Sequence, residues 1–412
     1  MFYYLQGHGE KTANAVTDNK YPESSLPYAT GPILVDPNLK AEVVFSGLAY
    51  PTDMAFLGRN DVLVIEKDIG IVSRIVNNTM VKEPLLDVNV STFGHRGMLG
   101  IAIGSSSPTS DNQILTSTKD NNYTSGGRNS EFNTNSTRDV FLYYTAIEGK
   151  DGEDITQDKQ PLGNVVYRYK MVDNKLVEPR LLMKLPATPG AIGDGGKILV
   201  NPNNNDHLYI TIGGIGIDGH KTKAQNIRNG LDPEGTSGIL VITRDGKPVS
   251  QNGILGDGDP VNKYYAYGIW NSFGIDFDHV TGKLWDAENG VIFGDEINLV
   301  ERGFNSGWNK IDGIWLRGYP LADAEDYVAP RETDNLLVDF DGKGKYIPPK
   351  FTWFDDIGPT AIKFFNSDKL GDHYQDDIFV GDIINGNIYH FELNKQRTEL
   401  LLPINSSLSD KL

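Results

Sequence analysis

Residues 267–308 read YGIWNSFGIDFDHVTGKLWDAENGVIFGDEINLVERGFNSGW, and this stretch gives the clearest indication of the fold. Three short apolar segments, Phe273–Phe277, Lys283–Asp286 and Ile297–Val300, are separated by residues rich in Gly, Asn and Asp. Such a pattern is typical of antiparallel strands joined by turns. Between the second and third segments we predict a loop with several carboxylates, a place where functional groups often lie. The polar residues of this predicted loop are Glu288, Asn289, Asp295 and Glu296.

The motifs of this stretch occur in an order that resembles a known family. They are Y-G-x-x-N-x-x-G-I from Tyr267, G-x-L-W from Gly282, E-x-G from Glu288, D-E-I-N-L from Asp295 and G-x-N-x-G-W from Gly303. Similar motifs continue in both directions, so that the resemblance covers about residues 36–393. The family is that of the soluble quinoprotein sugar dehydrogenases, the glucose/sorbosone dehydrogenase-like proteins.

The resemblance implies an all-β fold, a six-bladed β-propeller of four-stranded antiparallel blades. The composition agrees with it, because Gly is abundant (45 residues) and helical periodicity is scarce. Six blades of roughly 60 residues each fit the length of the chain. We predict an extended N-terminal tail or linker at 1–35 and the propeller at 36–412. Within it we expect a flexible loop at about 105–139, which is dominated by Ser, Thr, Asn and Gly.

Further strands are expected wherever the same pattern recurs along the chain. These segments are 51–56, 62–66, 71–76, 140–145, 165–171, 181–185, 198–200, 208–212, 239–243, 361–365, 377–380 and 387–392. We also expect a strand at 41–45, with residues 42–46 pairing near 386–392. An N-terminal strand in this place would complete the last blade and remove an exposed sheet edge.

The formal net charge of −17 argues against nucleic acid or an anionic bilayer surface as a partner. The absence of cysteine excludes disulfides, thiolate catalysis and zinc sites built from cysteine. The apolar start of the chain is too short to cross a bilayer, and it is also consistent with the remainder of an N-terminal membrane anchor. N-glycosylation sequons favour a secreted or cell-surface glycoprotein. They begin at Asn77, Asn89, Asn122, Asn135 and Asn405.

Members of the family bind pyrroloquinoline quinone (PQQ), a tricarboxylate, and a histidine takes the proton from the sugar hydroxyl. The histidine position of the family is Gly193 here, which has no side chain for this task. Asp194 follows it and is a candidate substitute base, provided that its pKa is raised. His95 occupies the position of a Gln or Glu in the family, and it is either a base, a metal ligand or a hydrogen-bonded structural residue.

The remaining cofactor positions also depart from the family pattern. Trp270, followed by Asn271, occupies the position of an arginine and either stacks on a sugar or planar ligand or packs in the core. Trp353 matches an aromatic lining position. The segment 382–387, which in the family offers basic residues to the PQQ carboxylates, contains no Lys or Arg. The predicted cofactor-binding residues are therefore His95, Asp194, Trp270, Asn271 and Trp353, but binding of PQQ itself is not expected.

A calcium site is the cofactor prediction that the residues support best. Carboxylates and backbone carbonyls suit this hard cation, and the family places its metal at the matching motifs. The predicted ligands are Glu288, Asn289, Gly290 and Asp295. The alternative is that these polar side chains cap turns and hold the loop.

Our first hypothesis is an exported or cell-surface propeller with a degenerate active site. It would act as a binding or structural module for calcium, glycans, another small molecule or surface proteins, and we lean towards a protein that is not an enzyme. The alternative is an active PQQ- and calcium-dependent aldose sugar dehydrogenase. A hydrolase or lactonase with a central metal is a third hypothesis.

Overall fold

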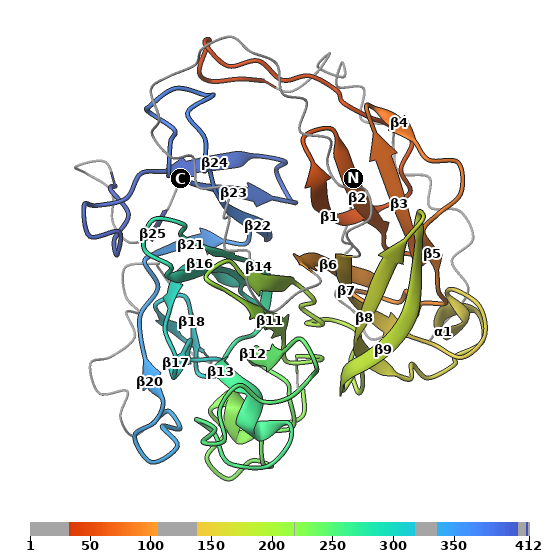
Figure 1. Ribbon diagram of the computed structural model, residues 1–412. Coiled ribbons are helices and arrows are strands. Elements are labelled where there is room, and N and C mark those ends of the chain that lie inside the picture. The colour runs from red at the N-terminus through yellow and green to blue at the C-terminus, as the bar shows by residue number, and fades with distance from the viewer. Residues whose placement is uncertain (1–32, 106–137, 218, 318–335, 403–408, 411–412) are drawn as a thin grey trace, which may run out of the picture.

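The chain folds almost entirely into β-strands (Figure 1). The computed structural model describes residues 33–105, 138–217, 219–317, 336–402 and 409–410. Helical structure in the described residues consists of α1 (Glu153–Thr156) and two 3-10 turns, Lys223–Gln225 and Val261–Lys263. The expectation of very little helix is therefore confirmed.

The strands of the described residues form five main sheets and one small hairpin, which together contain all twenty-five β elements. Sheet one contains β1 (Pro51–Gly58), β2 (Asp61–Glu66), β3 (Ile71–Val76), β4 (Thr79–Met80) and β5 (Leu86–Asp87), and sheet two β6 (Met98–Ser105), β7 (Arg138–Ala146), β8 (Gly163–Val172) and β9 (Lys175–Leu185). Sheet three contains β10 (Ile198–Asn201), β11 (Asn204–Ile212), β12 (Gly238–Thr243), β13 (Tyr264–Tyr267), β17 (Phe304–Asn305) and β20 (Lys345–Tyr346). Sheet four contains β14 (Asn271–Phe277), β15 (Leu284–Asn289), β16 (Phe293–Val300), β21 (Phe351–Asp355) and β25 (Ser409–Asp410), and sheet five β22 (Pro359–Phe364), β23 (Ile378–Asp382) and β24 (Ile388–Phe391). The hairpin pairs β18 (Ile311–Asp312) with β19 (Trp315–Leu316).

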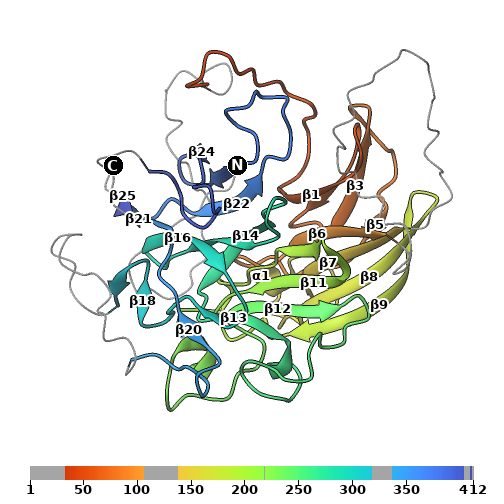
Figure 2. The same cartoon turned by 60° about the vertical axis from the view of Figure 1, so that its left-hand side comes forward.

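The five sheets follow one another around the molecule, from β1 to the blue β24 (Figures 1 and 2). Their first strands adjoin, because β1 contacts β6, β6 contacts β10, β10 contacts β14 and β14 contacts β22. Neighbouring long strands pair antiparallel, as expected. Short parallel pairs extend sheets three and four, which the antiparallel prediction did not include. The prediction of six four-stranded blades stays a prediction.

The stretch that begins at Tyr267 contains the three predicted strands, but the predicted carboxylate loop between them is wrong. Glu288 lies in β15, and Asp295 and Glu296 lie in β16, so the connection between these strands is a short turn. The two strands pair with Glu288 opposite Glu296. One face of sheet four is polar and buried, so alternate residues of both strands are polar. In the sequence alone, this concentration of polar residues resembles a loop.

The opposite face of sheet four is apolar and packs on sheet five. Trp285, Ala287, Ile297 and Trp353 form one core cluster with side chains of β22 and β23. Strand side chains alternate between two faces, so this arrangement fixes the register of sheet four. Because of the same alternation, the carboxylate side chains on the polar face of sheet four point into the interior of the protein.

The predicted N-terminal strand at 41–45 is also wrong. No strand forms there among the described residues, and Val43 and Val44 remain 84% and 63% exposed. The start of the described chain instead contacts the connection between β22 and β23, because the Tyr374 hydroxyl donates to Asp36 Oδ2 at 2.7 Å. The edge of β24 with which the segment was expected to pair has no further strand among the described residues. The predicted tail at 1–35 and the loop at 105–139 lie almost wholly outside the described residues.

Sheets two and three are joined by a buried ion pair at their outer parts. Arg244, which follows β12, donates from Nη2 to Asp139 Oδ2 of β7 at 2.5 Å, and both side chains are more than nine-tenths buried. The Arg244 guanidinium also lies 5.9 Å from the Phe141 ring. Nearer the surface, Asp245 pairs with Arg168 and Arg180 at 3.0 and 2.8 Å.

Candidate functional site

The candidate site residues come together on loops that precede the first strands of the sheets. His95 lies before β6, Asp194 before β10, and Trp270 before β14. Since these first strands adjoin, the loops meet at one end of the molecule. The Gly193 N–H donates to His95 Nδ1 at 3.1 Å, and the Gly195 N–H donates to Asn271 Oδ1 at 3.1 Å. Motifs that are scattered in the sequence thus become neighbours.

His95 is enclosed and uncharged. Burial, together with the nearby Lys67 ammonium, lowers its pKa to about 4. Its Nδ1 accepts the Gly193 N–H, which leaves the ring proton on Nε2 in the neutral form. Its ring lies 5.5 Å from that of Phe273. The structure therefore gives His95 the properties of a hydrogen-bonded neutral imidazole at neutral pH.

Asp194 is fully buried, and that burial raises its pKa to about 6. The Asn164 side chain donates to Oδ1 at 2.9 Å, whereas Oδ2 is buried without a hydrogen bond partner among the described residues. The backbone carbonyl of Asp194 accepts from the Tyr143 hydroxyl at 2.8 Å. A pKa near 6 suits a general base. The side chain, however, has no exposed surface and is held by Asn164 of sheet two.

Trp270 packs against Trp308, with the ring centroids 4.6 Å apart and the rings tilted by 41°. The Arg317 guanidinium lies over the Trp308 ring, 4.1 Å from its centroid. Trp270 and Trp308 are almost completely buried. A Cβ on Gly214 would lie 3.0 Å from the Trp270 ring, so a larger residue here would crowd the indole. Trp270 therefore packs in the protein interior where it contacts Trp308 and Gly214.

Trp353 is not brought to the other predicted cofactor-binding residues. It lies in β21 and packs between sheets four and five, with its ring 4.8 Å from Phe351 and 5.3 Å from Tyr389. Its side chain is almost fully buried in that apolar cluster. The other four predicted residues, His95, Asp194, Trp270 and Asn271, remain neighbours.

Buried carboxylates cover the polar face of sheet four, and the sequence prediction named only part of this group. Glu288 Oε1 accepts the Trp270 N–H at 2.6 Å. The Ser306 hydroxyl lies 2.6 Å from Glu288 Oε2 and 3.0 Å from Glu296 Oε2. A hydroxyl can donate its one proton to only one of the two carboxyl groups. The close approach of the Ser306 hydroxyl to both therefore favours a proton on one of the carboxyls, which can then donate to the hydroxyl oxygen. Asp286 is on the same face and accepts from the Ser272 hydroxyl.

The pKa values of these carboxyls are raised, chiefly because burial disfavours the charged form. The pKa of Asp286 rises to about 7 and that of Glu296 to about 8. The pKa of Glu288 is raised well above its usual value, first by burial and then by the charges of Glu296 and Asp286. Asp312, which the sequence prediction missed, has a pKa of about 7 for the same reason. The alternation of polar residues in β15 and β16 was the available signal for this group.

The four predicted calcium ligands do not converge in the structure. Glu288 accepts hydrogen bonds from the Trp270 N–H and the Ser306 hydroxyl. Asp295 instead accepts hydrogen bonds from the N–H groups of Gly290, Ile357 and Gly358 at 2.7–2.9 Å. The Asn289 side chain donates to the Pro359 carbonyl at 2.8 Å. Within the described ranges, no group of three or more His, Asp or Glu side chains is arranged to hold a metal ion. Calcium therefore stays a prediction.

Comparison with known proteins decides the family. The sequence profile described as Glucose / Sorbosone dehydrogenase matches residues 48–405, which is most of the chain. The chain belongs to this family. The quoted motifs and the arrangement of successive sheets agree with that membership, and the family resemblance predicted from the sequence is confirmed.

Individual relatives of the glucose/sorbosone dehydrogenase family are distant. An uncharacterised protein of Synechocystis is 25% identical over 87% of this chain and 77% of its own length. The aldose sugar dehydrogenase of Escherichia coli is 25% identical over 63% of this chain and 62% of its own length. Among solved structures, the soluble aldose sugar dehydrogenase of Escherichia coli has a TM-score of 0.61 at 18% identity, covering 87% of each chain. The PQQ-bound aldose sugar dehydrogenase of Streptomyces coelicolor has a TM-score of 0.58 at 22% identity, covering 87% of this chain and 81% of that one.

Removing the hydroxyl that lies between the two glutamates should destabilise this family member. We expect Ser306→Ala to lower the free energy of unfolding by about 1–3 kcal/mol, because buried carboxyl oxygens lose a partner. Urea denaturation followed by tryptophan fluorescence measures this loss. Ser250→Ala is the control, since its hydroxyl makes only exposed hydrogen bonds. Equal effects of the two substitutions would contradict the assignment.

Proposed function

We propose that this chain is an exported or cell-surface member of the family whose active site has lost its quinone chemistry. It acts as a binding or structural module, with calcium and glycans as its proposed ligands. The observation that carries the proposal is that the basic side chains around the candidate site form ion pairs within the chain. Those closest to the predicted PQQ-binding loops are already paired with carboxylates of the same chain.

PQQ carries three carboxylates, and buried carboxylates need cationic partners. The basic side chains near the loops form the pairs Lys67–Asp68 at 2.7 Å, Arg96–Asp154 at 3.6 Å and Lys197–Asp53 at 2.6 Å, and Arg317 beside Trp308 pairs with Asp312 at 3.4 Å. Arg96 also donates to the carbonyls of Ala187 and Gly190 at 2.7 and 2.8 Å. Carboxylates of PQQ bound at these cations would lie close to the carboxylates already paired with them, which would oppose binding. We infer that the residues present are a poor match for a tricarboxylate quinone.

The position of the catalytic histidine supports the same proposal. A Cβ on Gly193 would lie 3.3 Å from the N atoms of Gly214 and Ile215, and Gly193 has φ +79°. A larger side chain at this position would be strained as well as crowded. The chain thus lacks the histidine at this position, and a histidine there would be strained and crowded in the present loop conformation.

The proposal predicts that the protein does not turn over aldoses with PQQ. The test is to incubate it with PQQ and calcium, remove free cofactor by gel filtration, and follow dye reduction with several aldoses. We expect no retained quinone absorbance and no sugar-dependent reduction. Retention of PQQ at micromolar concentration, together with turnover, would overturn the proposal. A family member with the histidine and basic anchors intact serves as the positive control.

An active PQQ- and calcium-dependent aldose sugar dehydrogenase remains the second candidate. One observation favours it, namely that burial raises the pKa of Asp194 to about 6, in the range of a general base. Relatives of the chain are described as an aldose sugar dehydrogenase and a quinoprotein glucose dehydrogenase. If the assay shows turnover, Asp194→Asn should abolish it, whereas loss of less than about tenfold would exclude Asp194 as the base.

Calcium binding has its own test, because a ligand that binds only the folded state raises the melting temperature. Calcium in excess should raise the melting temperature of the metal-free protein, and a chelator should reverse the change. Asp295→Asn should remove the response. An identical melt of the wild type with and without calcium would remove calcium from the proposal.

The location and the finer architecture belong to the same proposal. We propose six closed blades and an extracytoplasmic location. Asn77 and Asn89 of two sequons lie in exposed positions, which supports access for glycosylation. Within the described residues, no helix is both long and apolar enough to cross a membrane. Peptide N-glycosidase should lower the mass of the protein from its natural source, and an unchanged mass would count against the glycoprotein.

A further inference from the structure

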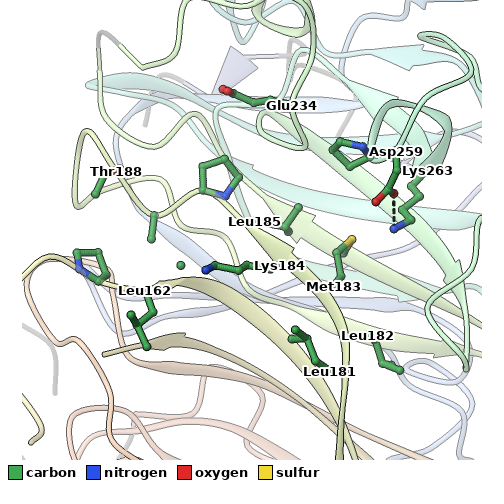
Figure 3. A pocket seen from close by; sticks show the side chains of 15 residues that line it. Leu162, Leu181, Leu182, Met183, Lys184, Leu185, Thr188, Glu234, Asp259 and Lys263 are labelled. Atoms are coloured by element: carbon green, nitrogen blue, oxygen red, sulfur yellow. Dashed lines mark ion pairs between the residues drawn. The ribbon is translucent and has the colours of Figure 1, made fainter. Parts of the chain in front are cut away.

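His220 lies between two acceptor groups that belong to different loops. Its Nε2 contacts the carbonyl oxygen of Thr188, in the segment after β9, and its Nδ1 forms an ion pair with Glu234 Oε1 at 2.5 Å, in the connection before β12. Thr188 and Glu234 both line a groove of about 630 Å³ between sheets two and three (Figure 3). The His220 side chain is 18% exposed, so it is largely enclosed but can still exchange a proton with solvent.

This arrangement requires a charged histidine. A neutral imidazole carries one N–H and can donate to only one of the two acceptors, so its other nitrogen would face an acceptor without a proton between them. The imidazolium has two N–H groups and can donate to both. The positions of Thr188 and Glu234 therefore select the protonated ring.

The other charged groups of the two loops and the groove act on His220 in both directions. They are Arg96, Lys184, Lys221, Arg228 and the ion pairs Lys223–Asp232 and Lys263–Asp259. The cations in this group oppose a further positive charge, and the paired carboxylates offset part of that effect. The Glu234 carboxylate, in direct contact with the ring, has the largest effect and raises the pKa of His220 above its ordinary value of 6.5, although burial lowers it.

The same segment after β9 is held by a second cation. Arg96 Nη2 donates to the carbonyls of Ala187 and Gly190 at 2.7 and 2.8 Å. Backbone hydrogen bonds of 2.7 and 3.3 Å also join the segment to residues 215–216. Arginine stays charged at every pH at which a protein is normally studied, whereas histidine does not. The histidine is therefore the titratable one of the two cations that bind these carbonyls.

The segment leads directly into the candidate site. Three residues beyond Gly190, the Gly193 N–H donates to His95 Nδ1 at 3.1 Å, and the buried Asp194 follows. The pKa of His95 is about 4, so this hydrogen bond does not change with pH above about 5. A contact that holds Thr188 therefore also restrains the backbone that places Asp194.

We propose that His220 is a positioning residue of the candidate site and that it works only as the imidazolium. The charged ring holds the segment 187–194 against the loop that contains Glu234, and the neutral ring loses one of its two contacts and loosens the segment. The contact is complete below pH 6.5 and is lost as the pH rises through the raised pKa of His220. The candidate site is thus most firmly assembled at mildly acidic pH. Only the consequence for ligand binding rests on the function proposed above.

The first test measures the protonation of His220 without any ligand. Isotope-labelled histidine allows each imidazole to be titrated by NMR, and the spectrum of His220→Gln assigns the signal. We expect His220 to titrate above pH 6.5 in the wild type, and Glu234→Gln to lower its pKa by about 1 or more. A wild-type pKa at or below 6.5, or the same pKa in Glu234→Gln, would overturn the proposal.

The second test measures the opening of residues 187–195 by hydrogen exchange and mass spectrometry at pH 5.5 and pH 8.5. His220→Arg supplies a guanidinium that is charged at both pH values and can donate to both acceptors. The wild type and this variant should exchange equally at pH 5.5, and the wild type should exchange about fivefold faster at pH 8.5. Asp194, with a pKa of about 6, titrates in both proteins, so comparing them at one pH cancels its contribution.

Two further variants make the exchange experiment specific. His220→Gln imitates the neutral ring, so it should exchange faster than the wild type at pH 5.5 and match it at pH 8.5. His373→Gln changes an exposed histidine between β22 and β23 and should leave the exchange of 187–195 unchanged. Equal exchange of the wild type and His220→Gln at pH 5.5, or the same response to pH in the wild type and His220→Arg, would overturn the proposal. Neither readout uses PQQ, calcium or a glycan, so this proposal and the proposed function can fail independently.

Discussion

The protein should be more stable at pH 5 than at pH 8, because protons bound to its buried carboxyls stabilise the folded state. The pKa of Asp286 is about 7 and that of Glu296 about 8 in the folded protein, compared with ordinary values of 3.8 and 4.5. Between the ordinary and the folded pKa values, the folded state binds more protons than the unfolded state. Stability therefore falls as the pH rises across this window, by about 1.4 kcal/mol for each pKa unit of one group.

The substitution that isolates this effect is Asp286→Asn. Asp286 Oδ2 and Asn298 Oδ1 are buried without hydrogen bond partners among the described residues, and the two residues are directly opposed on β15 and β16. A protonated Asp286 supplies the donor that these oxygens lack, and an asparagine supplies it at every pH. The variant should therefore be more stable than the wild type at pH 8 and show a shallower dependence of stability on pH.

Urea denaturation at a series of pH values from 5 to 8.5 measures both slopes. Asp372→Asn, at an exposed position, controls for the change in net charge. Parallel curves for the wild type and Asp286→Asn would show that Asp286 is not protonated in the folded state. His95 contributes with the opposite sign, because its lowered pKa of about 4 removes stability as the pH falls below its ordinary value of 6.5. The comparison with the variant at each pH cancels this contribution.

Breaking the ion pair between sheets two and three should have a comparable effect on stability. Arg244→Met leaves Asp139 buried, with the more distant Arg168 at 3.9 Å as its remaining basic neighbour. Removing one partner of a buried pair typically costs about 3–5 kcal/mol, because the other charge stays buried without compensation. The free energy of unfolding should fall by that amount.

Two matched variants make this prediction specific. Arg180→Met removes an ion pair with Asp245 whose side chains are about half exposed, and it should cost about 0–1 kcal/mol. The double variant Arg244→Met with Asp139→Leu removes both charges and should recover a large part of the loss. If Arg244→Met and Arg180→Met destabilise the protein equally, the pair is not a major link between the sheets.

Most strands could be predicted from the sequence because their apolar residues alternate or form short runs between turns. Thus 51–56, 62–66 and 71–76 became β1, β2 and β3. The errors have physical causes. Val43 and Val44 favour a strand, but a strand needs a partner edge, which local sequence does not specify. Glu288 and Glu296 favoured a loop because burial of a whole polar strand face is exceptional.

The sequence could predict which loops lie together, but only part of the group of side chains and none of its electrostatics. Family motifs pointed to His95, Asp194, Trp270 and Asn271, and the adjoining first strands do bring their loops together. The pairing of Lys197 with Asp53 depends on contacts between residues 144 positions apart, which no local pattern reveals. Trp353 is another example. Its position in the motif suggested a residue that lines the site, but it lies on the face of its strand that packs in the core.

The construction of each sheet mainly from strands that are consecutive in the chain has a consequence for how the protein folds. Contacts within a sheet close short loops, which carry little entropic cost, so each sheet can form soon after its own strands emerge from the ribosome. The bond between Tyr374 and Asp36 is different, because it joins residues 338 positions apart. It can form only when nearly the whole chain has been synthesised, and such long-range closure is the slow type of step in β-rich proteins. The contact between Asp36 and Tyr374 is therefore expected to be among the last to form as the chain is synthesised.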